Sequence, residues 1–191
     1  MRRLYFIILF VIISFQAARS QEVLWGVKGG MNVTDLGKKE LGYVTKLAWH
    51  AGGFSEFIMT PFVSIQVELM YSLQGAATDA SREVKLNYHY ANLPIIAKLY
   101  FLEDASFELG FQYGYLVKAI KKTDYGYTEN LNSQVNRNDF SLVFGFAYNL
   151  GETAVFNLRY NVGISDTRGA DIIIEQRVTN RVLQLSIGFA F

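Results

Sequence analysis

The stretch that decides the fold is the end of the chain, Arg181 to Phe191, which reads RVLQLSIGFAF. Large apolar residues stand at every second position of this stretch, and smaller or polar residues stand between them. The large apolar residues are Leu183, Leu185, Ile187, Phe189 and Phe191. Because successive side chains of a strand point to opposite faces, this period of two predicts a β-strand with one apolar face.

The aromatic residue at the carboxy terminus of this strand further limits the possible folds. A strand of a soluble sandwich can alternate in the same way, but it is rarely the last element of a chain. The transmembrane barrels of bacterial outer membranes end like this one, with lipid-facing residues at alternate positions counted back from a final Phe. We therefore expect the terminal strand to close such a barrel, and its apolar row to be the signal that the barrel-assembly machinery reads.

The same alternation recurs along the chain. We expect seven further strands at residues 23–32, 47–59, 62–74, 88–101, 107–119, 139–150 and 153–165. Their connections alternate between long polar loops and short turns, and the short ones contain Thr60-Pro61, Glu103-Asp104 and Gly151-Glu152. This organisation predicts an all-β fold: an eight-stranded antiparallel up-and-down transmembrane β-barrel in the outer membrane of a Gram-negative bacterium, with both termini periplasmic and the long loops extracellular.

The first 20 residues have the composition of a secretory signal peptide. Arg2 and Arg3 precede a short apolar run from Leu4 to Phe15, and Ala18-Arg19-Ser20 offers small residues to a signal peptidase. The apolar run is too short to span a bilayer as a helix. We expect a cleaved signal peptide over residues 1–20 and one barrel domain over residues 21–191.

The composition excludes several function classes. The chain has no cysteine, so it has no disulfide framework, no thiolate metal site and no lipoprotein attachment site. Removing the leader removes three arginines and no acidic residue, which leaves 15 basic against 17 acidic residues and a net charge of −2. This balance does not indicate binding to nucleic acid. We expect no metal and no cofactor.

The number and size of the residues on the apolar strand faces decide between two kinds of eight-stranded barrel. A soluble lipocalin-like barrel directs its apolar residues inward around a ligand. Too many aromatic residues stand on the apolar faces of this chain to fit inside eight strands, among them Phe107, Phe111, Phe140, Phe144, Phe146 and Phe156. We therefore expect the apolar faces to contact lipid, and glycines and small polar residues to fill the interior.

Six charged residues fall on the predicted inner face: Lys28, Glu56, Glu68, Lys98, Glu108 and Arg159. A ring of charges can act as an ion filter. Eight strands leave a lumen too narrow for a pore, however, which favours a packed network of paired side chains. We expect Glu68 to pair with Arg159 across the lumen, because the two lie at similar distances from turns at the same end. Lys98 and Glu108, on adjacent strands, are expected to extend this network.

The two histidines raise the alternative of a lipid A-modifying enzyme. His89 is expected near the outer end of its strand, close to Ser72 or Asp79, and His50 is expected to point inward. Neither histidine lies in a recognisable catalytic motif, and a triad is identified by geometry rather than by sequence position. We therefore predict no catalytic residues.

Two local features carry separate expectations. Pro94 stands inside a clear strand pattern, and proline cannot donate to a ladder, so it should lie at a bulge or an unpaired position. Ile172-Ile173-Ile174 is an apolar cluster in the last long loop. It is either a docking patch or a place where the strands continue above the membrane, as the β-propensity of isoleucine favours.

Several motifs follow one another in strand order: GVKGGMN, HAGGF, VELMYSLQG, LPIIAKLYF, FELGFQYGYLV, FNLRYNVGISD and the terminal Phe. In this order they resemble the PorT-like outer-membrane β-barrel family of Bacteroidetes. The resemblance covers essentially the whole chain after the leader. It implies a small eight-stranded barrel and no particular activity. The name-giving member is associated with the type IX secretion machinery, a role that the resemblance alone does not transfer.

We predict an integral outer-membrane barrel protein with a scaffold, assembly or secretion-accessory, or surface-interaction role and no catalysis. A lipid A-modifying enzyme and a small-solute channel are the alternatives. The expected partners are outer-membrane lipid and lipopolysaccharide, the barrel-assembly machinery through the C-terminal strand, and another outer-membrane protein.

Overall fold

The computed structural model describes residues 22–36, 43–78, 84–123, 126–133, 135–167 and 178–191. Within them, the eight long strands are β1 (Glu22–Asp35), β3 (Lys46–Thr60), β4 (Val63–Gln74), β6 (Val84–Tyr100), β7 (Ala105–Thr123), β9 (Asn138–Leu150), β10 (Ala154–Gly163) and β11 (Arg181–Ala190). The three short strands are β2 (Tyr43–Val44), β5 (Ala77–Thr78) and β8 (Thr128–Asn130). No helix in these ranges is long and apolar enough to cross a membrane. The expected signal peptide lies outside the described residues.

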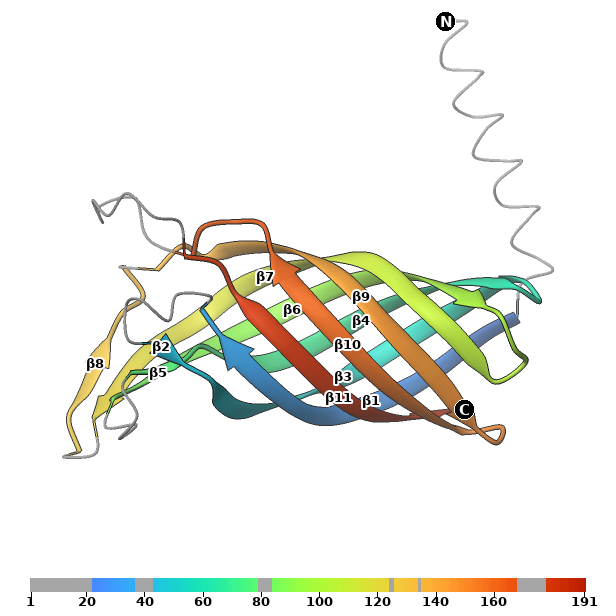
Figure 1. The fold of residues 1–191 in the computed structure, drawn as a ribbon, viewed down its shortest axis with the longest axis horizontal. Helices are drawn as coiled ribbons and strands as arrows, with labels where there is room; N and C mark the ends of the chain where they lie inside the picture. The colour runs from blue at the N-terminus through green and yellow to red at the C-terminus, as the bar shows by residue number, and fades with distance from the viewer. Residues whose placement is uncertain (1–21, 37–42, 79–83, 124–125, 134, 168–177) are drawn as a thin grey trace, which may run out of the picture.

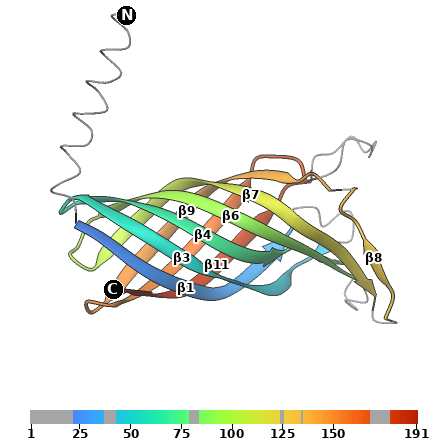
Figure 2. The same ribbon diagram turned by 180° about the vertical axis from the view of Figure 1, so that it is seen from behind.

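The eight long strands close into a barrel. Each pairs antiparallel with the next long strand along the chain, and β1 pairs with β11, for example Met31 with Leu185. Figures 1 and 2 show the resulting cylinder from opposite sides. Closure leaves the long strands without an unpaired edge, which is what a sheet in lipid requires. The predicted eight-stranded antiparallel barrel is confirmed.

The two ends of the barrel differ. At one end, here called the turn end, lie the start of β1, the C-terminus and short connections such as the one between β9 and β10 (Figure 1). At the other, here called the rim end, β6 and β7 continue beyond the predicted strands, and β5 and β8 pair with their outer parts. The sequence predicted polar loops in these segments, because the strands lose their apolar outer face there.

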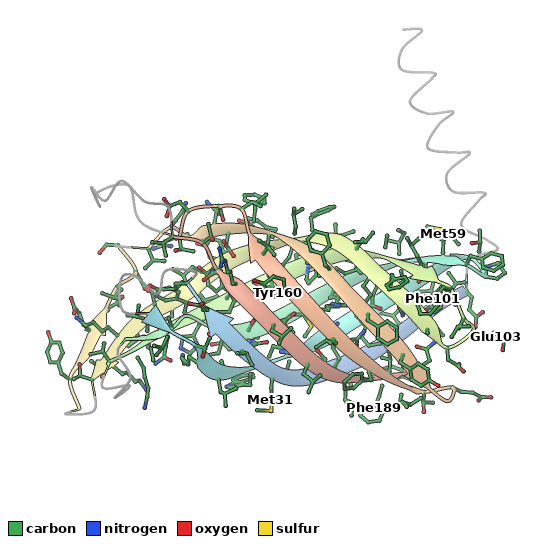
Figure 3. All side chains as sticks on the ribbon, in the orientation of Figure 1. Met31, Met59, Phe101, Glu103, Tyr160 and Phe189 are labelled. Carbon is green, nitrogen blue, oxygen red and sulfur yellow. The ribbon has the colours of Figure 1, made fainter. Side chains whose placement is uncertain are left out.

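The outer wall of the barrel is apolar. In β11, Leu183, Leu185, Ile187 and Phe189 are each more than 40% exposed, while Val182, Gln184 and Ser186 between them are buried. The labelled Met31, Met59 and Phe189 project outward from the wall (Figure 3). A continuous apolar surface around a closed barrel matches the lipid-facing band of outer-membrane barrels. The predicted orientation, with the apolar face outward, is confirmed along the wall.

Towards the rim end, the pattern inverts. Buried apolar residues form a cluster inside this part of the barrel: Leu36, Ala76, Leu86, Tyr88, Tyr90, Leu116, Ala119, Leu131, Val135 and Val178. On the same stretch of β6, Lys85, Asn87 and His89 point outward. Strands that project into water bury their apolar residues inside, as in a soluble protein. The expectation that the interior is glycine and small polar residues throughout is therefore wrong at this end.

Pro94 interrupts the ladder on one side. On the β7 side it is the partner of Gln112. On the β4 side, pairing stops between the Val67–Ile95 and Met70–Asn92 pairs, so that Pro94 has no partner there. Because proline has no N–H to donate, a gap at this point is its physical consequence. The predicted unpaired position is confirmed on the β4 side.

Candidate functional site

Four charged side chains from four strands meet in the centre of the lumen. Arg159 on β10 donates from Nε and Nη2 to the two carboxylate oxygens of Glu108 on β7, at 2.5 and 2.9 Å. Its Nη1 donates to Oε1 of Glu68 on β4 at 2.7 Å, and Nζ of Lys28 on β1 donates to the same oxygen at 2.6 Å. All four residues are buried. This central cluster carries two positive and two negative charges, so it fills the lumen without a net charge.

All six charged residues of the predicted network point inward and are buried. Glu68 and Arg159 are in contact, as the turn positions indicate. Lys98 and Glu108 both belong to the buried network, but through different partners. Lys98 and Glu108 are directly opposed across β6 and β7, but Arg159 takes both oxygens of Glu108, and Nζ of Lys98 instead donates to Glu56 at 2.7 Å.

The central cluster packs closely against β9 at Gly145, which has no side chain. A Cβ atom at this position would lie 2.8 Å from Cγ of Arg159 and 2.9 Å from Oε2 of Glu108. Real Cβ contacts are essentially never this short, so the stem of Arg159 and the carboxylate of Glu108 can approach β9 this closely only because position 145 has no side chain. The glycine thus defines where Arg159 meets Glu108.

A second buried group lies beside the pairing of β1 with β11, the closing seam. Nδ1 of His50 is 2.6 Å from Oδ1 of Asn32, and its Nε2 is 2.7 Å from Oγ of Ser186. Gln184 donates to the same Asn32 oxygen at 3.1 Å. This order of a serine, a histidine and an amide resembles a catalytic triad, in which a nucleophile contacts a general base and a third residue orients that base. All are enclosed in the barrel interior, so here they connect β1, β3 and β11 across the seam.

His89 does not join such a set. It is the β6 partner of Leu73, so it points outward, whereas Ser72 on β4 points inward. On the outer face, Nδ1 of His89 is 2.7 Å from the hydroxyl of Tyr71. The predicted proximity of His89 to Ser72 is therefore wrong, and Asp79, the other proposed neighbour, lies outside the described residues. So does the isoleucine cluster at 172–174.

Sequence reasoning did not find the group around His50. The alternation in β1 and β11 places Asn32 and Ser186 on the inner face, and this much can be predicted from the sequence. Their meeting depends on the register of the closing strands, in which Gly30 is the partner of both His50 and Ser186. A single sequence does not fix that register. Among the described residues, no group of three or more His, Cys, Asp or Glu side chains is placed to hold a metal ion.

The closed barrel with an apolar outer wall and a filled polar interior defines an integral outer-membrane β-barrel protein. Residues 16–169 match the family model described as "Outer membrane protein beta-barrel domain", and the chain belongs to this family. Membership places the protein in the Gram-negative outer membrane. None of the curated proteins compared with the chain matches it.

Solved structures share the fold. The Ail protein (attachment invasion locus) of Yersinia pestis superposes with a TM-score of 0.52 at 15% identity, covering 89% of this chain and 99% of Ail. Neisserial surface protein A (NspA) superposes with a TM-score of 0.55 at 8% identity, covering 90% of this chain and 97% of NspA. At these identities the likeness shows the fold alone.

Proposed function

We propose that the barrel is a closed membrane anchor that holds its rim end at the cell surface for contact with other outer-membrane components. The role is that of a scaffold, an assembly or secretion accessory, or a surface-interaction module. The observation that carries the proposal is the filled interior. Charged side chains from β1, β4, β7 and β10 meet in the centre, and an apolar cluster occupies the rim end.

The filled interior argues against a channel. An ion passing along the axis would have to separate Arg159 from Glu68 and Glu108, and then cross the apolar cluster. At the turn end, the cavity lined by Glu56, Lys98 and residues of the nearby strands has a volume of only about 60 Å³. Side chains fill the lumen of eight-stranded barrels in the same way.

The interior also argues against catalysis. Ser186 has the contacts of an activated nucleophile, but its side chain is buried and faces the lumen rather than the lipid. A lipid substrate approaches from the outer wall, which is apolar along β11. We therefore assign the His50 group to closure of the barrel and not to a lipid A-modifying reaction.

Three finer assignments belong to this proposal. The motifs GVKGGMN and FNLRYNVGISD support placing the chain among the PorT-like barrels of Bacteroidetes. The exposed row from Leu183 to Phe191, next to the closing seam, supports recognition of β11 by the barrel-assembly machinery. The short connections at the turn end support a periplasmic position for that end and for both termini.

Cysteine labelling tests the orientation. The chain has no cysteine, so single substitutions carry no background. Thr128→Cys in β8 and Glu103→Cys between β6 and β7 replace exposed residues at opposite ends. In intact cells, a bulky membrane-impermeant maleimide should label Thr128→Cys, and it should label Glu103→Cys only after the outer membrane is opened. The reverse pattern would show that the rim end faces the periplasm.

A further inference from the structure

The barrel interior contains a buried acidic side chain that has no cation beside it. The acidic side chains buried within the described residues are Glu56, Glu68, Glu108 and Asp139. Each of the three glutamates accepts from a lysine or an arginine at 2.7 Å or less. Asp139, near the start of β9, forms no ion pair with any other described residue. A buried charge is costly unless it is paired, so this carboxylate needs a counter-charge.

The hydrogen bonds of Asp139 do not supply that charge. Oγ of Ser165 donates to Oδ1 at 2.7 Å, and Oγ of Ser141 donates to Oδ2 at 3.3 Å. Nδ2 of Asn180 also donates to Oδ2, at 3.3 Å. All three donors are neutral. An ionised carboxylate can accept about four hydrogen bonds, so these donors orient Asp139 and leave one of its lone pairs for a further ligand.

Asn92 on β6 is a buried polar side chain that also lacks a partner. The residue is only 1% exposed, and neither its Oδ1 nor its Nδ2 has a hydrogen-bond partner within the described part of the chain. Buried amides are normally hydrogen-bonded, and leaving one without a partner costs about 1–3 kcal/mol. A ligand that contacts this amide would remove the cost.

Gly114 on β7 leaves a space between the two side chains. It is the register partner of both Asn92 and Asp139. A Cβ atom at this position would lie 2.8 Å from Oδ1 of Asn92, 3.3 Å from Cδ1 of Tyr90 and 3.5 Å from Cβ of Asp139. The first distance is too short for a carbon atom, but a cation approaches its oxygen ligands more closely than a carbon does. The space therefore suits an ion better than a methyl group.

This space lies between two filled layers of the lumen. Along the inner face of β7, Glu108 of the central cluster comes before Gly114, and Leu116 of the apolar cluster at the rim end comes after it. An ion beside Gly114 is therefore enclosed on both sides. It would be bound as the barrel folds, and its presence agrees with an interior through which ions do not pass.

We propose that Asp139 and Asn92 bind one monovalent cation, sodium or potassium, in the space beside Gly114. Carboxylate and amide oxygens are the ligands that hard cations prefer. A monovalent ion cancels the single negative charge of Asp139. A calcium ion would leave a net positive charge in the lumen, and it takes about six to eight oxygen ligands. The ion would connect β6 to β9 across the glycine of β7.

Urea unfolding of the full mature protein in lipid vesicles tests the site. Sodium chloride is raised while choline chloride is lowered, so that the ionic strength stays constant, and a parallel series uses potassium chloride. A cation that binds only the folded state stabilises it by mass action. At concentrations well above the dissociation constant, the folding equilibrium constant should therefore rise about tenfold for each tenfold rise in the cation. Asp139→Asn should abolish this dependence.

Two further variants control the test. Glu152→Gln removes the same charge from the exposed turn between β9 and β10, and it should keep the full dependence. Asn92→Leu keeps the carboxylate but removes the amide oxygen. It should raise the cation concentration at which the dependence begins by roughly tenfold, because one contact to a charged group is lost. This variant also tests the site if Asp139→Asn does not fold.

Three results would overturn the proposal. One is equal stability of the unaltered protein in sodium, potassium and choline chloride. Another is an unchanged dependence in Asp139→Asn, which would mean that the cations act elsewhere, for example at the lipid surface. The third is an unchanged onset in Asn92→Leu, which would exclude the amide as a ligand.

Discussion

Replacing Arg159 with methionine should lower the free energy of unfolding by about 3–5 kcal/mol, because it leaves buried carboxylates without their cation. Glu108 would lose both hydrogen bonds to the guanidinium, at 2.5 and 2.9 Å. Glu68 would keep Lys28 at 2.6 Å. The uncompensated charge would thus fall on Glu108, two strands away from the pair that remains.

A second substitution should therefore rescue the variant selectively. Arg159→Met with Glu108→Gln removes the orphaned charge and should recover most of the lost stability. Arg159→Met with Glu68→Gln should recover less, because it leaves Lys28 without its carboxylate as well as leaving Glu108 unpaired. The measurement is the temperature at which the folded band of the unboiled protein disappears on a denaturing gel. Equal rescue by both substitutions, or no loss in the single variant, would contradict the assigned pairing.

A charge on the outer wall should have the next largest effect. Ile187 lies in the middle of the terminal apolar row and is 49% exposed. Ile187→Arg should destabilise the barrel by about 2–4 kcal/mol, the usual cost of an arginine facing lipid at the bilayer midplane.

The matched control is Leu102→Arg in the connection between β6 and β7, where the leucine is 62% exposed. Near the membrane interface the same change costs only about 0–1 kcal/mol. Urea unfolding in lipid vesicles measures both variants. A similar cost at the two positions, or a small cost at Ile187, would mean that β11 does not face the bilayer interior.

The alternation of side chains predicted much of this structure. A period of two gives the strand faces without any three-dimensional information, so it placed all six charged residues inside and the row ending at Phe191 outside. It also predicted contact between Glu68 and Arg159, because both were counted from turns at the same end. The carboxylate that pairs with Lys98 was not predictable. This pairing depends on Arg159 binding both oxygens of Glu108, and on the space beside Arg159 and Glu108 that Gly145 leaves.

The rim end was harder to predict for a different reason. Beyond the wall, water replaces lipid on the outside, so Leu86, Tyr88 and Tyr90 turn inward while the polar residues between them face out. The alternation continues, but here the apolar residues face the interior and the polar residues face outward. In the sequence, such a polar outer row resembles a loop. That Lys85 lies opposite Lys122 depends on the register of β6 and β7, which a single sequence does not fix.

We propose that the interior of this barrel is closed to ions and that the protein acts through its surface. The most direct test is electrical recording across a planar bilayer that contains the folded protein, whose insertion is verified by its heat-sensitive gel band. A closed interior predicts no stepwise current above that of the lipid alone. Reproducible steps of uniform size would contradict a lumen closed by Arg159, Glu68 and Glu108, and would favour a small-solute channel.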